Sequence, residues 1–240
     1  MFTCAMAPDS LPFRQPRRQL PPGRHGLSRS FVVHNQRERI LGAVADVASA
    51  AGYVPMTVED VIVVAGVSRR TFYDHFSGKE EAFLLAYDAV VAQLNQHVFQ
   101  AWAARTEFVD RVRDGLAAFL SFVAREPAFA DMCIVEVLAA GPEAIERRDA
   151  TLKAFAALFD RAAVELMGHD KPPPLIAETV VGGIYQVVYS RVVRGEVREL
   201  PALLPDIVYS ALLPYLGHEA ARREYAALRR KGERAARRAS

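Results

Sequence analysis

The sequence predicts an all-α protein of about nine helices. Apolar residues recur at helical spacing along most of the chain, Gly and Pro separate these stretches, and no stretch alternates apolar and polar residues as strands do. The 240 residues are 51% hydrophobic and 24% charged, which is ordinary for a globular protein that buries a sizeable core. We therefore expect a folded helical protein without internal repeats.

The charge is unevenly distributed along the chain. Residues 1–31 have a net charge of +4 and residues 218–240 of +5, whereas residues 32–217 have −7. The first segment contains five prolines and few apolar residues, so it cannot offset the entropy of ordering by burial, and we expect a disordered basic arm. For the basic tail at 218–240 disorder is also favoured over a bound state. Charge alone allows a nucleic-acid partner without establishing one.

Several protein classes have no support in the sequence. Cys4 and Cys133 form neither a disulfide framework nor a metal motif. No secretory signal is visible, and no apolar run reaches the ~18 residues of a transmembrane helix, so we expect a soluble cytoplasmic protein without membrane contact. The six histidines lack H-E-x-x-H spacing, and G-x-S-x-G and phosphate-loop motifs are absent. We therefore expect no catalytic residues, no metal and no cofactor, and an enzyme is the least favoured function.

The first three helices are predicted by periodicity and caps. Apolar residues from Ile40 to Ala51 share one face, and Gly52 ends that helix. Thr57 can cap a second helix, with Asp60 at its third position, and Ser68 can cap a third. The remaining helices are expected over about 77–94, 108–123, 127–139, 142–168, 175–194 and 202–216.

The second and third helices have the arrangement of a helix-turn-helix, because a tight turn with Gly66 joins two short helices. Arg69 and Arg70 fall in the first turn of the third helix, where the helix dipole disfavours cations, but where a DNA-reading helix meets the major groove. Two solvated arginines, or a half-buried Tyr73 and His75, are the alternative interpretation. The candidate DNA-contacting residues are Thr57, Ser68, Arg69, Arg70, Thr71, Tyr73, His75 and Lys79.

The stretch from Thr57 through Ala65-Gly66-Val67-Ser68 and Thr71-Phe72-Tyr73-Asp74-His75-Phe76 to Lys79-Glu80 resembles the DNA-binding segment of the TetR/AcrR family. Arg37, Ile40-Leu41 and Ala51-Gly52 resemble that family's first helix. The resemblance covers about residues 35–85. It implies three DNA-binding helices within 32–80 and six helices within 81–217 for ligand binding and dimerisation. It also implies a homodimer on operator DNA and, by family habit, a repressor released by a small apolar effector.

Candidate residues for these implied sites lie on the later helices. The helix near 175–194 is too apolar for one narrow buried stripe, which fits a dimer interface, although an internal core helix is the alternative. The candidate interface residues are Val181, Gly182, Ile184, Val188 and Leu212. The candidate ligand contacts are Trp102, Phe119, Phe122, Met132, Glu136, Phe155, Phe159, Tyr185, Gln186 and Tyr189. For each of these, ordinary core packing is the more common role, and a helical scaffold or small-molecule-binding protein is the rival function.

Overall fold

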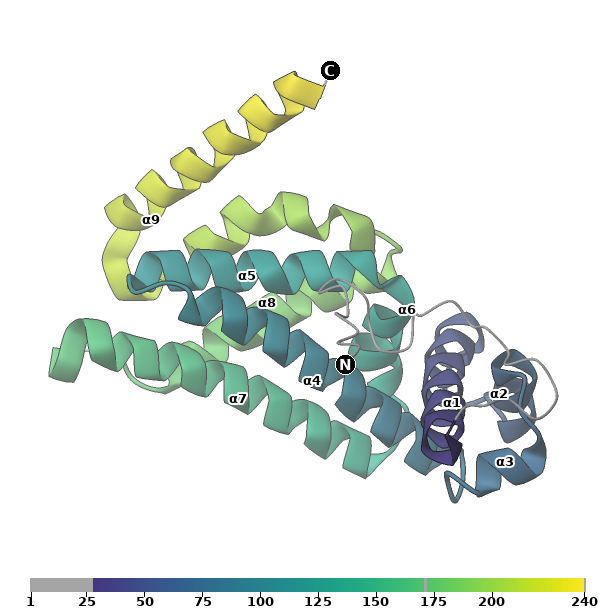
Figure 1. Cartoon of the computed structure of the whole chain (residues 1–240). Coiled ribbons are helices and arrows are strands. Elements are labelled where there is room, and N and C mark those ends of the chain that lie inside the picture. Colours follow the sequence, from purple (N-terminus) through teal and green to yellow (C-terminus); the bar gives the residue numbers. More distant parts are fainter. Residues whose placement is uncertain (1–27, 171, 240) are drawn as a thin grey trace.

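The computed structural model describes residues 28–170 and 172–239, and every regular element within these residues is helical. The described chain has nine α-helices, which confirms the predicted fold class (Figure 1). They are α1 (Arg29–Ala51), α2 (Val58–Ala65), α3 (Arg69–Tyr73), α4 (Lys79–Ala103), α5 (Phe108–Arg125), α6 (Pro127–Ala130), α7 (Pro142–Met167), α8 (Leu175–Val193) and α9 (Leu204–Ala239). Two irregular turns follow α6, a π-helical turn at Asp131–Val135 and a 3₁₀ turn at Glu136–Leu138, and a further 3₁₀ segment, Val197–Leu203, leads into α9.

The helices α1, α2 and α3 form one end of the molecule, and α4, α5, α7 and α8 form its body (Figure 1). The core of the first end is continuous with residues of the body: Phe72 and Phe83 belong to the same buried cluster as Phe129 and Met132. A second cluster fills the body between α5, α7, α8 and α9. The amino-terminal helices are therefore packed directly on the α6 segment rather than attached by a free linker.

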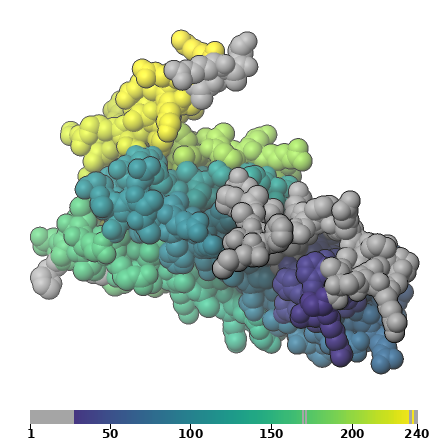
Figure 2. Space-filling view, in the orientation of Figure 1, coloured from purple at the N-terminus to yellow at the C-terminus, as the bar shows by residue number. Residues whose placement is uncertain are grey.

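Both chain ends correct the sequence prediction. The expected arm over 1–31 lies mostly outside the described residues, but Ser28 caps α1 and residues from Arg29 onward are helical. Residues 218–239, for which the charge pattern favours disorder, continue α9 beyond a kink at Gly217 (φ 74°). The carboxyl-terminal part of this helix stands away from the body, at the end opposite α1–α3 (Figure 2).

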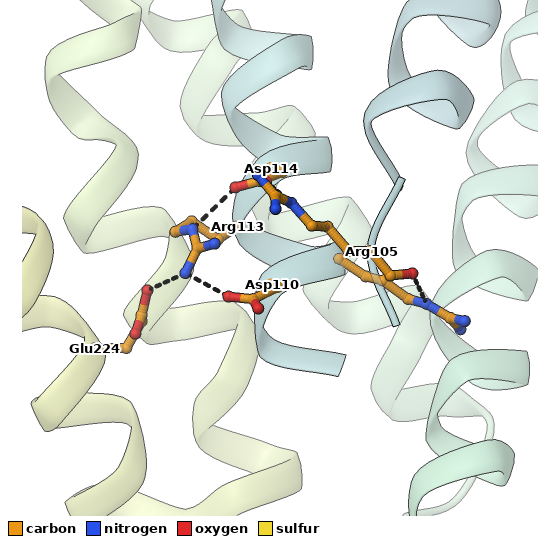
Figure 3. A network of polar contacts seen from close by, with 6 residues as sticks. Arg105, Asp110, Arg113, Asp114 and Glu224 are labelled. Carbon is orange, nitrogen blue, oxygen red and sulfur yellow. Dashed lines mark hydrogen bonds and ion pairs between the residues drawn. The ribbon is translucent and has the colours of Figure 1, made fainter. Parts of the chain in front are cut away.

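A network of ion pairs explains why the start of this last segment is ordered. Arg113 on α5 contacts Glu224 on α9 at 3.1 Å and also Asp110 and Asp114 on its own helix, while Arg105 pairs with Asp114 at 2.5 Å (Figure 3). Apolar contacts act at the same place, because Ala221 is fully buried and Leu228 packs on the core. The charge pattern predicted a solvated tail, but these contacts order the segment as helix.

One helical stretch, Val197–Arg234, is long and apolar enough to cross a membrane by length and composition. Its apolar character has a structural explanation. Leu200, Val208 and Leu212 are fully buried in the core of the body, where this stretch packs on α5. The buried residues make part of this stretch a core element, although only 33% of its most apolar window is buried.

Candidate nucleic-acid interface and ligand cavity

The α2–turn–α3 unit has helix-turn-helix geometry. The Thr57 hydroxyl accepts from the Asp60 backbone N–H, and the Asp60 carboxylate accepts from the Thr57 N–H, which completes a capping box. Gly66 lies in the left-handed region (φ 63°, ψ 43°), where a side chain would be strained. Ser68 then caps α3 by accepting from the Thr71 N–H at 3.0 Å. These local features were all predicted from the sequence.

The buried and exposed faces of α3 are clearly separated. Phe72 and Phe76 are buried and contact each other, with ring centroids 5.6 Å apart. Arg69, Arg70 and Tyr73 are exposed, and the Tyr73 side chain has half of its surface accessible. The exposed face therefore presents two cations and a phenol, the groups that contact bases and phosphates in major-groove recognition.

The other predicted DNA contacts are less available. Thr57 and Ser68 are exposed but use their hydroxyls as helix caps. Thr71 and His75 are half-buried. Burial lowers the pKa of His75 below its usual value, and the nearby Arg37 charge lowers it further, so this imidazole is neutral near pH 7.

Arg69 has a competing partner within the protein. Its guanidinium lies 2.5 Å from the Glu59 carboxylate on α2, and both side chains are exposed. An exposed pair of this kind contributes only about 0–1 kcal/mol, so it can open when a phosphate approaches. The sequence did not indicate this pair because the two residues lie on different helices.

Lys79 was predicted to contact phosphate, but the structure places its ammonium group inside the domain. It donates hydrogen bonds to the carbonyl oxygens of Tyr53, Val54 and Met56 at 3.2, 3.1 and 2.8 Å. It also lies 4.8 Å from the centre of the Tyr53 ring, at cation–π distance. Lys79 therefore caps the end of the α1–α2 loop, and we remove it from the DNA-contacting set.

Arg39 makes a contact at the turn that sequence reasoning missed. Its guanidinium donates to the carbonyl oxygens of Ala65 and Gly66, where α2 ends and the turn begins. Arg39 thus fixes the turn that orients α3. Its partners lie 26 and 27 positions away, so no local sequence signal could have identified the role.

A cavity of about 120 Å³ lies in the body between α4, α5, α6, α7 and α8. Its wall is mostly aliphatic and aromatic. Of the predicted ligand contacts, the residues on the wall are Trp102, Phe119, Phe122, Phe155, Phe159 and Tyr185. Trp102 contacts Phe159 edge to face at 5.6 Å, and a side chain at Gly115 would come within 3.0 Å of the Trp102 ring. Gly115 therefore lets α5 approach the ring.

The other four predicted ligand contacts do not line the cavity: Met132, Glu136, Gln186 and Tyr189. Met132 is fully buried in the cluster shared with the amino-terminal helices, and Gln186 is exposed on α8. Sequence reasoning missed Tyr87, Arg148 and Thr151, which do line the cavity. A usable signal existed, because Arg148, Thr151 and Phe155 are spaced along one face of α7.

Glu136 has a different role from the one predicted. Its carboxylate accepts a hydrogen bond from the Tyr53 backbone N–H at 2.6 Å, in the loop after α1. Nearby, the Ser49 hydroxyl on α1 donates to Asp131 at 2.7 Å. Burial raises the pKa of Asp131. Two carboxylates of the irregular turns thus hold the end of α1, and between them lie Cys133 and Ile134, which line the cavity.

The predicted dimer residues are mostly internal. Val188 and Leu212 are fully buried within the protomer, and Val181 and Ile184 line the cavity, so only Gly182 is exposed. The reason is that α8 is apolar on nearly every side, so its composition does not identify which face is covered. Apart from Glu178, the exposed residues in the central turns of α8 are uncharged. They are Thr179, Gly182, Gly183, Gln186 and Val187.

The described structure combines a helix-turn-helix at one end with a helical body that contains an apolar cavity, an arrangement suited to a ligand-responsive DNA-binding protein. Residues 40–86 match the family described as bacterial regulatory proteins, tetR family. This match covers the helix-turn-helix and its flanking segments, so the amino-terminal part of the chain is similar to the DNA-binding domain of TetR family transcriptional regulators.

A curated relative agrees with this assignment. The chain is 32% identical over 88 residues to the HTH-type transcriptional activator FasR of Mycolicibacterium smegmatis. The aligned part is 37% of this chain and spans only 40% of the length of that relative.

Solved structures share the fold over most of the chain. FadR from Bacillus halodurans, a fatty acid degradation regulator, has a TM-score of 0.68 at 17% identity and covers 77% of this chain and 96% of its own. FadR from Bacillus subtilis in complex with stearoyl-CoA has a TM-score of 0.65 at 18% identity, covering 75% and 97%. A TetR-like regulator from Rhodococcus sp. RHA1 has a TM-score of 0.62 at 20% identity, covering 78% and 98%.

Proposed function

We propose that this regulator binds its operator as a homodimer through α3 and leaves it when a small apolar molecule fills the cavity. The observation that carries the proposal is a connection between the cavity wall and the amino-terminal helices. Cys133 and Ile134 line the cavity. Beside them, Asp131 accepts a hydrogen bond from Ser49, and Glu136 accepts one from the Tyr53 N–H after α1. A molecule that displaces the cavity wall therefore displaces groups bonded to the DNA-binding unit.

The proposed DNA contacts follow from exposure. Arg70 and Tyr73 present their side chains from α3, and Arg69 joins them once its pair with Glu59 opens. Thr57 and Ser68 stay in the set because they stand at the helix starts, where the backbone N–H groups of the first turn attract phosphate. Their own hydroxyls serve as helix caps. Thr71 and His75 are kept as secondary contacts because they are half-buried.

The dimer follows from the need to read two half-sites. A single helix-turn-helix reaches one major groove, whereas two related copies reach successive grooves about 34–36 Å apart. The central exposed face of α8 is uncharged from Thr179 to Val187 and contains Gly182 and Gly183, which allow close helix approach.

The cavity of about 120 Å³ holds a molecule of roughly benzene size as it stands, so an effector with a long apolar chain must widen it on binding. The wall runs from Tyr87 to Trp102 along α4 and is apolar over most of that length. The stearoyl-CoA in the Bacillus subtilis FadR structure, which shares the fold, supports an acyl chain. We propose a long-chain acyl compound as the effector class.

Release of the DNA requires the effector to bind the DNA-free conformation better, since equal affinity for both would shift nothing. The helix α4 connects Lys79, at the DNA-binding unit, with Trp102 in the wall, so both α4 and the Glu136 contact transmit the change. We propose a cytoplasmic repressor. The described activator role of FasR makes the direction of regulation a separate measurement.

The test is a gel shift with the DNA that flanks the coding sequence, with and without hexadecanoyl-CoA. Arg70→Ala should lower operator affinity by about 1–3 kcal/mol without changing the melting temperature. Addition of hexadecanoyl-CoA should weaken the wild-type shift. A wild-type protein that binds no flanking DNA, or whose binding ignores acyl compounds, contradicts the corresponding half of the proposal, and a reporter gene decides between repression and activation.

A further inference from the structure

The residues of the cavity wall that carry polar groups gather at one end, although nearly all of the surface that they present to the cavity is apolar. Tyr87, Arg148 and Thr151 lie in the first halves of α4 and α7, and Trp102 and Phe159 lie in their second halves. Both helices run from the side of α1–α3 toward the opposite end (Figure 1). At a rise of 1.5 Å per residue, Arg148 and Phe159 are about 16 Å apart along α7. The cavity is therefore suited to a molecule with two unlike ends.

Most polar groups at this end already have partners within the protein. The Thr151 hydroxyl donates to the Arg147 carbonyl oxygen at 2.9 Å, and the Tyr87 hydroxyl donates to Thr151 at 3.4 Å. The Tyr185 hydroxyl donates to the Ile134 carbonyl oxygen at 2.8 Å. Glu126, the other charged residue of the wall, also interacts within the protein.

Arg148 differs from these groups. Its guanidinium pairs with Asp149 at 2.8 Å and stacks on the Tyr185 ring, 4.6 Å from its centre. These contacts hold the guanidinium in place at the cavity wall. Its Nε is buried, however, and finds no hydrogen-bond partner within the described part of the chain. A buried donor without an acceptor is costly, so a ligand oxygen that reaches Nε once the surrounding side chains move would remove an unfavourable state of the protein.

We propose that Arg148 binds the carbonyl or carboxylate oxygen of an acyl ligand whose chain extends to Trp102 and Phe159. The inference rests on the proposed function and adds the orientation of the ligand and the residue that selects its head. The Arg148 side chain is 23% exposed, so it also reaches the protein surface, and a larger group attached to the carbonyl would have a short path to solvent there. A free fatty acid and an acyl thioester share this chemistry.

The experiment uses Trp102, the single tryptophan of the chain, as a fluorescence probe within the cavity. The full-length protein is titrated with hexadecanoate, hexadecanoyl-CoA and hexadecan-1-ol, which has the same tail but no carbonyl oxygen. We expect the better carbonyl compound to bind about tenfold to a hundredfold more tightly than the alcohol, as for a hydrogen bond that involves a charged group. Tighter binding of hexadecanoate identifies a free acid, and tighter binding of hexadecanoyl-CoA a thioester.

Two variants test the residue. Arg148→Met keeps the length of the side chain and removes its donors, so the preference over the alcohol should disappear. Arg161→Met is the matched control, because Arg161 is exposed on the same helix and does not line the cavity. If circular dichroism shows that Arg148→Met does not fold, Arg148→Gln replaces it.

The outcomes separate the two proposals. A wild-type protein that binds all three probes equally, or an Arg148→Met protein that keeps the preference, overturns the assignment of Arg148 but leaves the acyl effector standing. A wild-type protein whose fluorescence and melting temperature respond to none of the probes overturns the acyl effector, and the assignment of Arg148 with it.

Discussion

The Glu136 carboxylate accepts a hydrogen bond from the Tyr53 backbone N–H at 2.6 Å, across 83 positions of sequence. Tyr53 follows α1, and its ring packs edge to face on Phe83 at the start of α4. Glu136 therefore touches the point where the DNA-binding unit meets both the first helix of the body and the irregular turns after α6. A carboxylate on an amide donor is a charge-assisted bond that fixes the geometry of this junction.

Glu136→Ala should weaken the coupling between cavity and DNA. The Tyr53 N–H loses its acceptor, so movement of the cavity wall no longer displaces the end of α1 by this route. We expect operator binding without effector to persist and the reduction caused by hexadecanoyl-CoA to become smaller in a gel shift. Glu146→Ala, at an exposed residue of α7, is the control. An unchanged response to the effector in Glu136→Ala would contradict this role.

Lys79→Met should lower stability rather than DNA contact. Removal of the ammonium leaves the carbonyl oxygens of Tyr53, Val54 and Met56 without this donor. We expect the free energy of unfolding to fall by about 1–3 kcal/mol, measured by urea denaturation. Arg70→Met, at an exposed residue of α3, should leave that value unchanged while it weakens the gel shift. Equal stability of Lys79→Met and wild type would restore Lys79 as a candidate phosphate contact.

The sequence predicted local features and missed distant ones. The Thr57 capping box, the Gly66 turn and the Ser68 cap depend on neighbours within four positions, so periodicity and residue type were sufficient. The partners of Lys79 and Glu136 are 23 to 83 positions away and arise only from packing. The segment at 218–239 looked disordered by charge, but Arg113 pairs with Glu224 there. The buried face of α8 was also indeterminate, because α8 is apolar nearly all round.

Glu59→Gln should strengthen DNA binding. Loss of the carboxylate charge frees Arg69 from its exposed ion pair and removes a negative charge from the face that approaches phosphate. We expect a gain of up to about 1 kcal/mol in operator affinity, larger at low salt, from fluorescence anisotropy. In Arg69→Ala the additional change Glu59→Gln should have a smaller effect, because the pair no longer exists. Additive effects of the two substitutions would show that the ion pair does not restrain Arg69.

His75 should make stability depend on pH below neutrality. Its folded-state pKa lies below its usual value because of burial and the Arg37 charge, so the unfolded chain binds the proton more readily. The contribution of the neutral imidazole is present above about pH 6.5 and is lost as the pH falls below that value. We expect the melting temperature to fall between pH 7.5 and 5.5 by more in the wild type than in His75→Gln. Equal shifts in both proteins would show that the imidazole is not perturbed.

Gly183→Glu should separate the dimer without disturbing the protomer. A side chain at Gly183 would meet no atom within 4 Å, and replacement of a mid-helix glycine removes a cost of roughly 0.5–1 kcal/mol, so the isolated fold should be at least as stable. Across a twofold axis, the same change places a carboxylate in an uncharged face that approaches its mate.

Val188→Glu is unsuitable because Val188 is fully buried within the protomer and a charge there would unfold it. Gly232→Glu is the matched control, because nothing lies within 4 Å of that position either. Light scattering at micromolar concentration should give a dimer for wild type and Gly232→Glu, and a monomer with weakened operator binding for Gly183→Glu. A Gly183→Glu protein that remains dimeric would place the interface on another face, and a monomeric wild type would rule out the dimer.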